Sequence, residues 1–253
     1  MMPNPFAIDW LFPVAAAPFV GSFLGLLADR LPAGGRVVSG RSACPHCRHR
    51  LGPRDLVPVL SWLASRGRCR YCGTRLGVFY PAIEIGALAI AVWAASMLGG
   101  WLLWAGCALG WTLLALGLID ARHTVLPDEL TLPLIGAGLG VAYLIDPALL
   151  PDHAIGAAAG FAAFMAVGFA YRRLRGREGL GLGDAKLLAG AGAWVSWWGL
   201  PSVVLLAALG ALTVALGRSI AGRPVSLTDE VPFGSALALA LWLVWLYGPL
   251  GFG

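Results

Sequence analysis

Long apolar stretches separated by short polar connections dominate this sequence. An α-helix rises about 1.5 Å per residue, so roughly 20 apolar residues cross the ~30 Å hydrocarbon layer of a bilayer. Eight stretches, the sixth of them shorter and rich in glycine, follow one another at 6–28, 80–98, 101–119, 126–145, 154–171, 185–199, 201–220 and 232–250. The pattern predicts an all-α polytopic membrane protein with about eight transmembrane helices.

One polar segment is too long to be a simple connection between membrane helices. It covers residues 30–78, follows a first apolar stretch within residues 1–29, and contains most of the arginines of the chain. Residues 79–253 hold the other seven apolar stretches. We therefore expect a first transmembrane helix, then a small extramembrane domain, then a seven-helix membrane domain.

The composition agrees with a bilayer environment and excludes other classes of protein. Of the 253 residues, 58% are hydrophobic and 12% are charged, whereas a soluble domain carries roughly 25% charged residues. A disordered chain and an ordinary soluble domain are therefore excluded. The net charge of +5 comes from basic residues gathered in a few loops rather than spread over one face. We expect a lipid bilayer, and no nucleic acid, as the partner.

The positions of the basic residues predict the orientation of the chain in the membrane. Ten arginines lie between Arg30 and Arg75, and every other Lys and Arg follows the third, fifth or seventh apolar stretch. Basic loops stay on the cytoplasmic side, so we expect residues 30–78 to face the cytoplasm and both termini to lie outside. The same topology places Asp120 and Asp184 at the cytoplasmic membrane surface.

Two C-x-x-C pairs, Cys44 with Cys47 and Cys69 with Cys72, lie 21 residues apart in the polar segment. A two-residue gap lets one tight turn present two thiolates, and two such turns complete a tetrahedral Zn²⁺ site. A pair of disulfides is disfavoured in the reducing cytoplasm, and a thioredoxin-like redox pair needs a βαβ context. We expect a structural zinc ion, because four thiolates leave no position for a catalytic water.

Two aspartates stand at the ends of apolar stretches in distant parts of the sequence. Asp120 directly follows the third stretch, and Asp184 follows alternating glycines that include Gly181 and Gly183. Acidic residues at membrane depth are usually functional, and two carboxyl groups that share a proton can divide acid and base work. Glycine lets a second backbone come close, so Gly181, Gly183 and the nearby Lys186 are candidates for docking an extended peptide substrate.

Other interpretations of these residues stay open. Both acids can simply mark helix ends, with Arg122 and Lys186 as their ion-pair partners at the interface. A polytopic transporter or channel uses intramembrane acids to carry protons or cations, and places them near the middle of the bilayer. A non-catalytic, zinc-bearing scaffold of a secretion complex explains the cysteines and leaves the aspartates without a role.

In their order along the chain, these residues resemble the type IV prepilin leader peptidase family, the bifunctional prepilin peptidase/N-methyltransferases. The resemblance covers nearly the whole chain and rests on Gly21-Ser-Phe-Leu, Arg30-Leu-Pro32, the segment from Cys44 to Cys72, Tyr80-Pro81 with Glu84, Asp120 with Leu126-Pro-Asp128, Gly181-Leu-Gly-Asp184-Ala-Lys186, and Pro232-Phe-Gly234. The motif that ends in Asp184 resembles the G-x-G-D signature of the family.

The resemblance implies an intramembrane aspartyl protease with Asp120 and Asp184 as its catalytic pair. Such an enzyme removes the basic leader of type IV prepilins or type II secretion pseudopilins after a glycine, at the cytoplasmic face of the bacterial inner membrane. Bifunctional members then methylate the new N-terminal amine with S-adenosylmethionine, an activity associated with the zinc-bearing loop. The surroundings of Glu84 and Gly25 are candidates for binding this cofactor; Gly25 stands where the family often has Asn.

Overall fold

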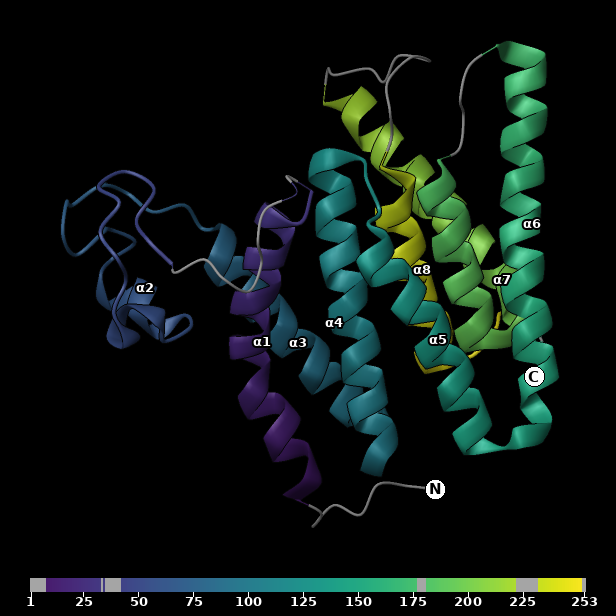
Figure 1. The fold of residues 1–253 in the computed structure, drawn as a ribbon, viewed down its shortest axis with the longest axis horizontal. Helices are drawn as coiled ribbons and strands as arrows, with labels where there is room; N and C mark the ends of the chain where they lie inside the picture. The colour runs from purple at the N-terminus through teal and green to yellow at the C-terminus, as the bar shows by residue number, and fades with distance from the viewer. Residues whose placement is uncertain (1–7, 33, 35–41, 177–180, 222–231, 252–253) are drawn as a thin grey trace. The chain divides into compact units, whose positions relative to one another are not determined.

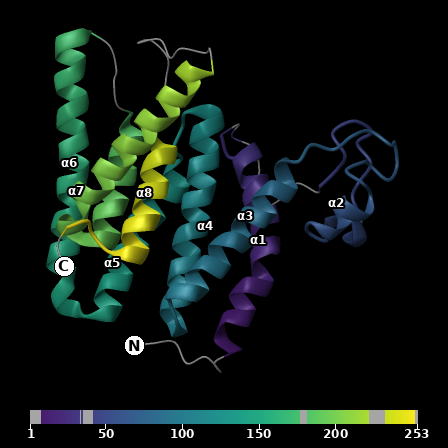
Figure 2. The ribbon, with the colours of Figure 1, turned by 180° about the vertical axis from the view of Figure 1, so that it is seen from behind.

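The computed structural model describes residues 8–32, 34, 42–176, 181–221 and 232–251, and outside the cysteine-bearing segment these residues are almost entirely helical (Figures 1 and 2). The α-helices are α1 (Leu11–Arg30), α2 (Leu60–Ala64), α3 (Phe79–Met97), α4 (Gly100–His123), α5 (Asp128–Ile145), α6 (Leu150–Arg175), α7 (Leu182–Ile220) and α8 (Phe233–Tyr247). Short 3-10 helices cover Ile8–Trp10, Pro53–Leu56 and Pro147–Leu149.

The lengths of the helices confirm the expected class of fold. Among the described residues, six helices are long and apolar enough to cross a membrane, namely α1, α3, α4, α5, α6 and α7, and α8 is apolar but has 15 residues. The protein is therefore an all-α polytopic membrane protein. The expected number of eight spans is approximate, because α7 combines the two stretches expected at 185–199 and 201–220.

Helix α7 has 39 residues, and a straight helix of that length would be about 59 Å long, nearly twice the hydrocarbon thickness. It is interrupted at Ser196, whose φ of 59° and ψ of −178° are non-helical. Just before the interruption, Trp194 contacts Trp245 near the end of α8, with ring centroids 5.0 Å apart. After it, Gly210 lies against Ala236 near the start of α8. The chain thus doubles back at Ser196, as the ribbon of α7 in Figure 1 shows.

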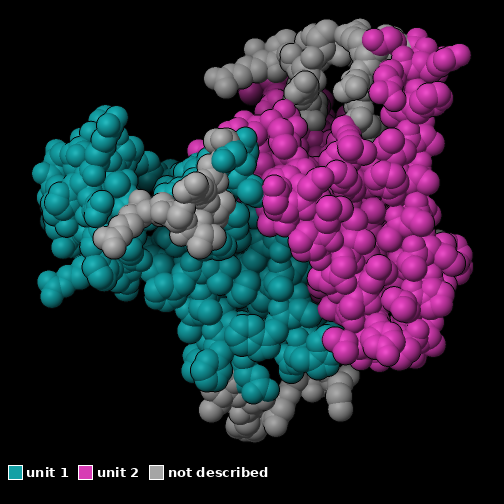
Figure 3. All heavy atoms as spheres, in the orientation of Figure 1, with its two compact units in different colours: residues 1–115 teal, residues 116–253 magenta. Residues whose placement is uncertain are grey.

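The chain divides into two compact units, Met1–Ala115 and Leu116–Gly253 (Figure 3). In the first unit, α1 and α3 approach closely at Gly21, where an added Cβ would lie 2.6 Å from the Cα of Glu84. One turn further on, a Cβ on Gly25 would lie 2.9 Å from the ring of Tyr80. Small residues at such positions let two membrane helices pack backbone to backbone.

In the second unit, glycines bring α6 and α7 together in the same way. A Cβ added to Gly192 of α7 would collide with the carbonyl oxygen of Gly156 on α6. Gly160, one turn along α6, has the carbonyl oxygen of Leu188 at 2.6 Å from its own hypothetical Cβ. The G-x-x-x-G spacing of Gly156 and Gly160 therefore forms a continuous contact between the two backbones. This packing positions the start of α7, which carries Asp184.

We expect Gly192→Ala to destabilise the protein, because the added methyl group meets backbone atoms that have no freedom to move aside. Overpacking typically costs about 1–3 kcal/mol, which corresponds to a fall of roughly 5 °C in the unfolding temperature. Thermal unfolding of the purified protein in detergent measures the change. The matched control is Gly140→Ala on α5, where an added Cβ meets nothing within 4 Å. An equal effect of the two substitutions would contradict the packing described here.

Candidate active site and metal centre

The two predicted aspartates lie near each other in the second unit. Asp120 stands in the last turn of α4 and is 5% exposed, and Asp184 is the third residue of α7 and is partly buried. Leu126 packs against Gly183, the residue before Asp184, and against Gly234, which lies beside the Asp120 carboxyl group. The fold therefore brings together two acids that are 64 positions apart in the sequence.

Asp120 is held by the N-terminus of α8. The backbone N–H of Ser235 donates to Oδ2 of Asp120 at 2.6 Å, and the Ser235 hydroxyl lies 3.0 Å from the same oxygen and 2.9 Å from the carbonyl oxygen of Gly117. The first-turn N–H groups of a helix have no partner within the helix and carry partial positive charge. Asp120 thus caps α8 from another helix, and this contact stabilises a negative charge on its carboxylate.

Two glycines make room for this arrangement. A Cβ on Gly234 would lie 2.9 Å from Cγ of Asp120 and 2.9 Å from Cδ1 of Leu126, so a side chain there would displace the carboxyl group. A Cβ on Gly183 would lie 2.9 Å from Cβ of Leu126. Leu126, in the connection between α4 and α5, therefore packs against both glycine positions and joins the segments that carry the two acids.

Asp184 is held less tightly than Asp120. Its Oδ2 accepts a hydrogen bond of 3.4 Å from the backbone N–H of Gly181, at the N-terminus of its own helix. Gly181 itself is exposed, and an added Cβ there would make only ordinary contact with Asp184 at 3.6 Å. Of the glycines proposed to admit a peptide, Gly183 is thus required by the packing of Leu126, and Gly181 is the more accessible one.

Lys186, considered above as an ion-pair partner of the aspartates, instead pairs with a third acid. Its Nζ lies 2.6 Å and 2.8 Å from the two carboxylate oxygens of Asp128, at the start of α5. This ion pair joins α5 to α7 about half a turn beyond Asp184. Lys186, the third residue of the expected docking set, therefore has a structural contact of its own.

Ser235 is the residue that the sequence reasoning missed. The motif Pro232-Phe-Gly234 contributes to the family resemblance, whereas the serine that follows it belongs to none of the motifs. The available signal was its position as a small polar residue in the first turn of an apolar helix, where a side-chain or backbone donor is free to cap another group.

The four predicted cysteines form one cluster in the first unit. Their Sγ atoms all lie within 4.8 Å of one another, and those of Cys44 and Cys72 are 3.9 Å apart. Zn–S bonds of about 2.3 Å in a tetrahedron separate neighbouring sulfurs by about 3.8 Å. The cluster can therefore hold a metal ion in the way the C-x-x-C pairs predicted. Cys107, by contrast, is buried within α4.

The two halves of the cluster have the same local backbone. Arg48 N–H donates to the Cys44 carbonyl oxygen and Cys44 N–H to His49, while Gly73 N–H donates to Cys69. The residue after each second cysteine has a positive φ, 55° at Arg48 and 71° at Gly73. Each C-x-x-C pair thus forms the tight turn that presents two thiolates on one side.

A hydrogen-bonded network ties the two turns to the rest of the segment. His49 stacks on Tyr71, with ring centroids 3.6 Å apart, and the Tyr71 hydroxyl donates to Oδ2 of Asp55 at 3.1 Å. This hydrogen bond, together with burial, raises the pKa of Tyr71 above its ordinary value. Arg70 Nε lies 3.5 Å from Oδ1 of Asp55. Asp55 therefore connects the second turn to the chain between the turns.

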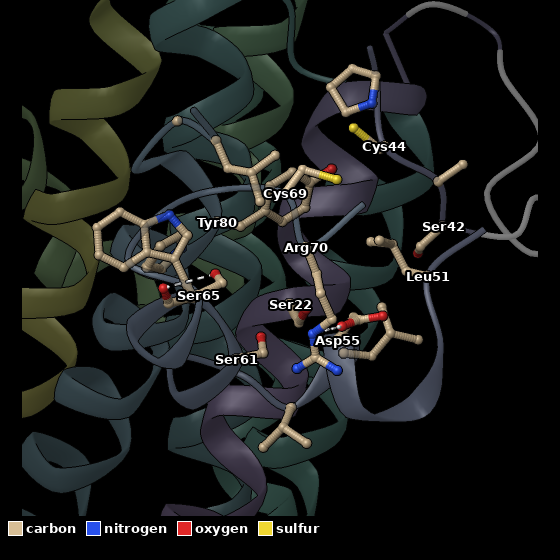
Figure 4. Close-up of a pocket in the computed structure, with 18 of the residues that line it drawn as sticks. Ser22, Ser42, Cys44, Leu51, Asp55, Ser61, Ser65, Cys69, Arg70 and Tyr80 are labelled. Atoms are coloured by element: carbon tan, nitrogen blue, oxygen red, sulfur yellow. Dashed lines mark hydrogen bonds and ion pairs between the residues drawn. The ribbon is translucent and has the colours of Figure 1, made fainter. Parts of the chain in front are cut away.

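A cavity of about 310 Å³ lies between this segment and helices α1 and α3 (Figure 4). Glu84, one of the two predicted cofactor candidates, forms part of its wall and is 5% exposed. The other candidate, Gly25, packs behind the ring of Tyr80, which also lines the cavity. A larger residue at position 25 would displace that ring, so glycine there is a packing requirement of this chain.

Two family models match this sequence. Residues 16–98 match the model described as the bacterial peptidase A24 N-terminal domain, and residues 107–216 match the type IV leader peptidase family. The chain is similar to relatives named prepilin leader peptidase/N-methyltransferase. It is 41% identical to that of Aeromonas hydrophila over 82% of this chain and 72% of the relative.

Two further relatives carry the same name. The chain is 44% identical to the protein of Burkholderia pseudomallei (strain 1026b), over 83% of this chain and 68% of the relative. It is 35% identical to the protein of Pseudomonas aeruginosa, over 90% of this chain and 87% of the relative. This chain belongs to the type IV leader peptidase family. The resemblance drawn from its motifs is thus confirmed, and Asp120 and Asp184 both lie within the region matched by the peptidase model. No solved structure matches it.

Proposed function

We propose that this protein cleaves the leader peptide from type IV prepilins or type II secretion pseudopilins after a glycine, and then methylates the new N-terminal residue. Membership of the leader peptidase family and the names of the relatives support this proposal. The observation that carries it is the placement of the buried Asp120 near Asp184, with Leu126 packed against the segments that carry both acids. A transporter or a non-catalytic scaffold is not favoured, because neither accounts for this family membership.

In the proposed cleavage, the two carboxyl groups divide the proton transfers. One carboxylate takes a proton from water as the water oxygen attacks the carbonyl carbon of the scissile peptide bond, and the other carboxyl group gives its proton to the carbonyl oxygen. The described hydrogen bonds to Asp120 all end at Oδ2. Because these donors stabilise a negative charge, Asp120 is suited to act as the base and Asp184 as the acid.

The proposed location is the bacterial inner membrane, with the active site and the cysteine cluster at the cytoplasmic face and both termini outside. The distribution of Lys and Arg between alternate connections supports this orientation. The proposed parts are a first transmembrane helix at 1–29, a zinc-binding domain at 30–78 and a membrane domain carrying the protease site at 79–253. Gly181, Gly183 and Lys186 remain proposed substrate contacts beside Asp184.

We also propose that the cysteine cluster binds a structural zinc ion. The sulfur separations and the repeated turn geometry fit Zn²⁺, and four thiolates complete its coordination without an open position for water. Hydrogen bonding between Cys72 and Thr74 lowers the pKa of the Cys72 thiol to about 6, which favours the thiolate form that binds metal. The segment has few large apolar residues in its interior, so metal ligation would supply much of its folding energy.

The proposed methyl donor is S-adenosylmethionine. The relatives' name, N-methyltransferase, supports a methyl donor. When bound, S-adenosylmethionine supplies an activated methyl group on a positively charged sulfur, which a deprotonated amine can take up.

We expect Asp120→Asn and Asp184→Asn each to reduce leader cleavage by at least about 1,000-fold, because each removes one of the two groups that transfer protons. The measurement is the cleavage rate of a purified prepilin by the full-length protein. The matched control is Asp146→Asn, whose oxygen still accepts the hydrogen bond from the N–H of Ala148. Near-normal cleavage by either active-site variant would refute the proposed protease.

We expect Ser235→Ala to lower kcat for cleavage by about tenfold while KM changes little, because the variant loses the hydroxyl that contacts Asp120 and keeps the backbone donor. Ser235→Thr keeps a hydroxyl and should restore most of the rate. Steady-state kinetics with a prepilin substrate measure both values. A purely structural role would lower the amount of folded enzyme without separating the alanine and threonine variants in kcat.

We expect the purified protein to contain one zinc ion per chain and Cys44→Ser to lose most of it, because the variant removes one of four ligands. Elemental analysis by mass spectrometry gives the ratio of metal to protein. The control is Cys107→Ser, whose buried side chain lies in α4 and outside the cluster. An unchanged zinc ratio in Cys44→Ser would remove the metal assignment.

A further inference from the structure

Helix α2 carries its apolar side chains on the outside and polar side chains on the inside. Ser61, Trp62 and Ser65 line the cavity between the cysteine-bearing segment and helices α1 and α3. Leu60 and Leu63 are not among the lining residues, and they are 65% and 56% exposed. A surface helix in water has the opposite arrangement, with its apolar side against the protein. The polarity of α2 therefore indicates an apolar environment around its outer side.

One hydrogen bond fixes the depth of α2 relative to the membrane helices. The backbone N–H of Val59, the residue before α2, donates to Oε2 of Glu84 on α3 at 2.7 Å. Glu84 follows Phe79, the first residue of α3, by five positions, or about 7.5 Å along the helix. Gly21 of α1, which packs against Glu84, precedes Arg30 by nine positions, or roughly 13–14 Å. The anchor of α2 thus lies within the length of α1 and α3 and not beyond their ends.

The position of α2 in the first unit agrees with this depth. Figures 1 and 2 show α2 at a level between the two ends of α1. A helical side chain leans toward the N-terminus of its helix, so the Glu84 carboxylate leans toward the end of α3 that joins the cysteine-bearing segment. Helices α1 and α3 are both long and apolar enough to cross a membrane. Helix α2 therefore lies at the depth where lipid headgroups meet the acyl chains, about 5–10 Å below the surface.

The charge of the segment indicates which kind of apolar surface α2 meets. Residues 30–78 contain ten arginines and a single acid, Asp55, and this acid is already paired with Arg70. Arg54 and Arg66, which precede and follow the leucines in the sequence, are exposed. Anionic lipid headgroups attract such residues. The basic leader of the proposed substrate would be repelled by them, which argues against a prepilin as the occupant of this surface.

We propose that the outer side of α2, formed by Leu60 and Leu63, inserts into one lipid leaflet, with Arg54 and Arg66 at its anionic headgroups. The cysteine-bearing segment is then a membrane-seated domain and not one that extends freely into water. This inference goes beyond the proposed function, because it requires only that α1 and α3 cross the bilayer. It stays valid if the protein cleaves no prepilin, and its failure would leave the proposed cleavage untouched.

A spin label at position 60 or 63 tests the depth directly. The label is attached to p-acetylphenylalanine, placed at one position at a time in the full-length protein, so that the cysteines stay unmodified. The protein is reconstituted in vesicles of phosphatidylglycerol and phosphatidylethanolamine. Collisions with oxygen, which concentrates in lipid, and with a water-soluble nickel complex are then measured by paramagnetic resonance.

Two reference positions in the same unit calibrate the measurement. Val92 is 52% exposed in the second half of α3 and serves as the lipid reference, and the exposed Arg50 in the cysteine-bearing segment serves as the water reference. We expect labels at 60 and 63 to collide more with oxygen than with nickel, as at Val92, and the label at Arg50 to show the reverse. The unfolding temperature shows that each labelled protein is folded.

Either of two results would overturn the proposal. Labels at 60 and 63 that collide mainly with nickel would mean that the leucines face water. Labels reached by neither reagent would mean that protein covers them, whether a second copy or another part of the chain.

Hydrogen–deuterium exchange tests the role of the arginines. We expect the amides of α2 to exchange about fivefold more slowly in the vesicles above than in neutral phosphatidylcholine vesicles, because each arginine near an anionic surface favours the docked state. Arg54→Gln/Arg66→Gln should remove most of this difference. The control is Arg218→Gln, an exposed arginine near the end of α7 in the second unit, which should keep it. Equal exchange of the unchanged protein in both lipids would contradict the proposed contact with anionic headgroups.

Discussion

The proposed peptidase depends on one contact, the capping of helix α8 by the carboxylate of Asp120. Oδ2 of this residue receives the backbone N–H of Ser235 at 2.6 Å and lies 3.0 Å from its hydroxyl. A buried carboxylate is costly unless donors surround it, and the free N–H groups of a helix terminus provide them. The same contact fixes where the carboxyl group lies, in the part of the fold where Leu126 packs against the start of α7 that carries Asp184.

This arrangement requires neighbouring segments to pack more closely than residues with a side chain would allow. Gly234 leaves space for Asp120, Gly183 leaves space for Leu126, and Gly192 lets α7 lie directly on α6. The glycine-rich character of these helices is therefore a property of the site as well as of membrane packing. In the first unit the same device, at Gly21 and Gly25, brings α1 against α3 and shapes one wall of the cavity.

Much of the fold could be predicted from the sequence, because membrane helices are read from the length of apolar runs. The reversal within α7 was expected near residue 200, yet it occurs at Ser196, whose conformation depends on the packing around it and not on a local turn signal. The cysteine cluster could be predicted because the C-x-x-C spacing itself determines the turn. The partner of Lys186 could not, since Asp128 and Lys186 are 58 positions apart and meet only through tertiary packing.

Ser235 shows more clearly which part of the site could not be predicted from the sequence. Its side chain is unremarkable in sequence, and it matters because a third helix places its N–H and hydroxyl on Asp120. The central claim is that the side chains at positions 120 and 184 face each other. Dibromobimane, a short reagent that fluoresces when it bridges two thiols, tests this directly in the variant Asp120→Cys/Asp184→Cys, with the bridged peptides identified by mass spectrometry after proteolysis. A bridge between positions 120 and 184, absent from the Asp120→Cys/Asp146→Cys control, is the predicted result; the absence of that bridge in the folded double variant would contradict the account.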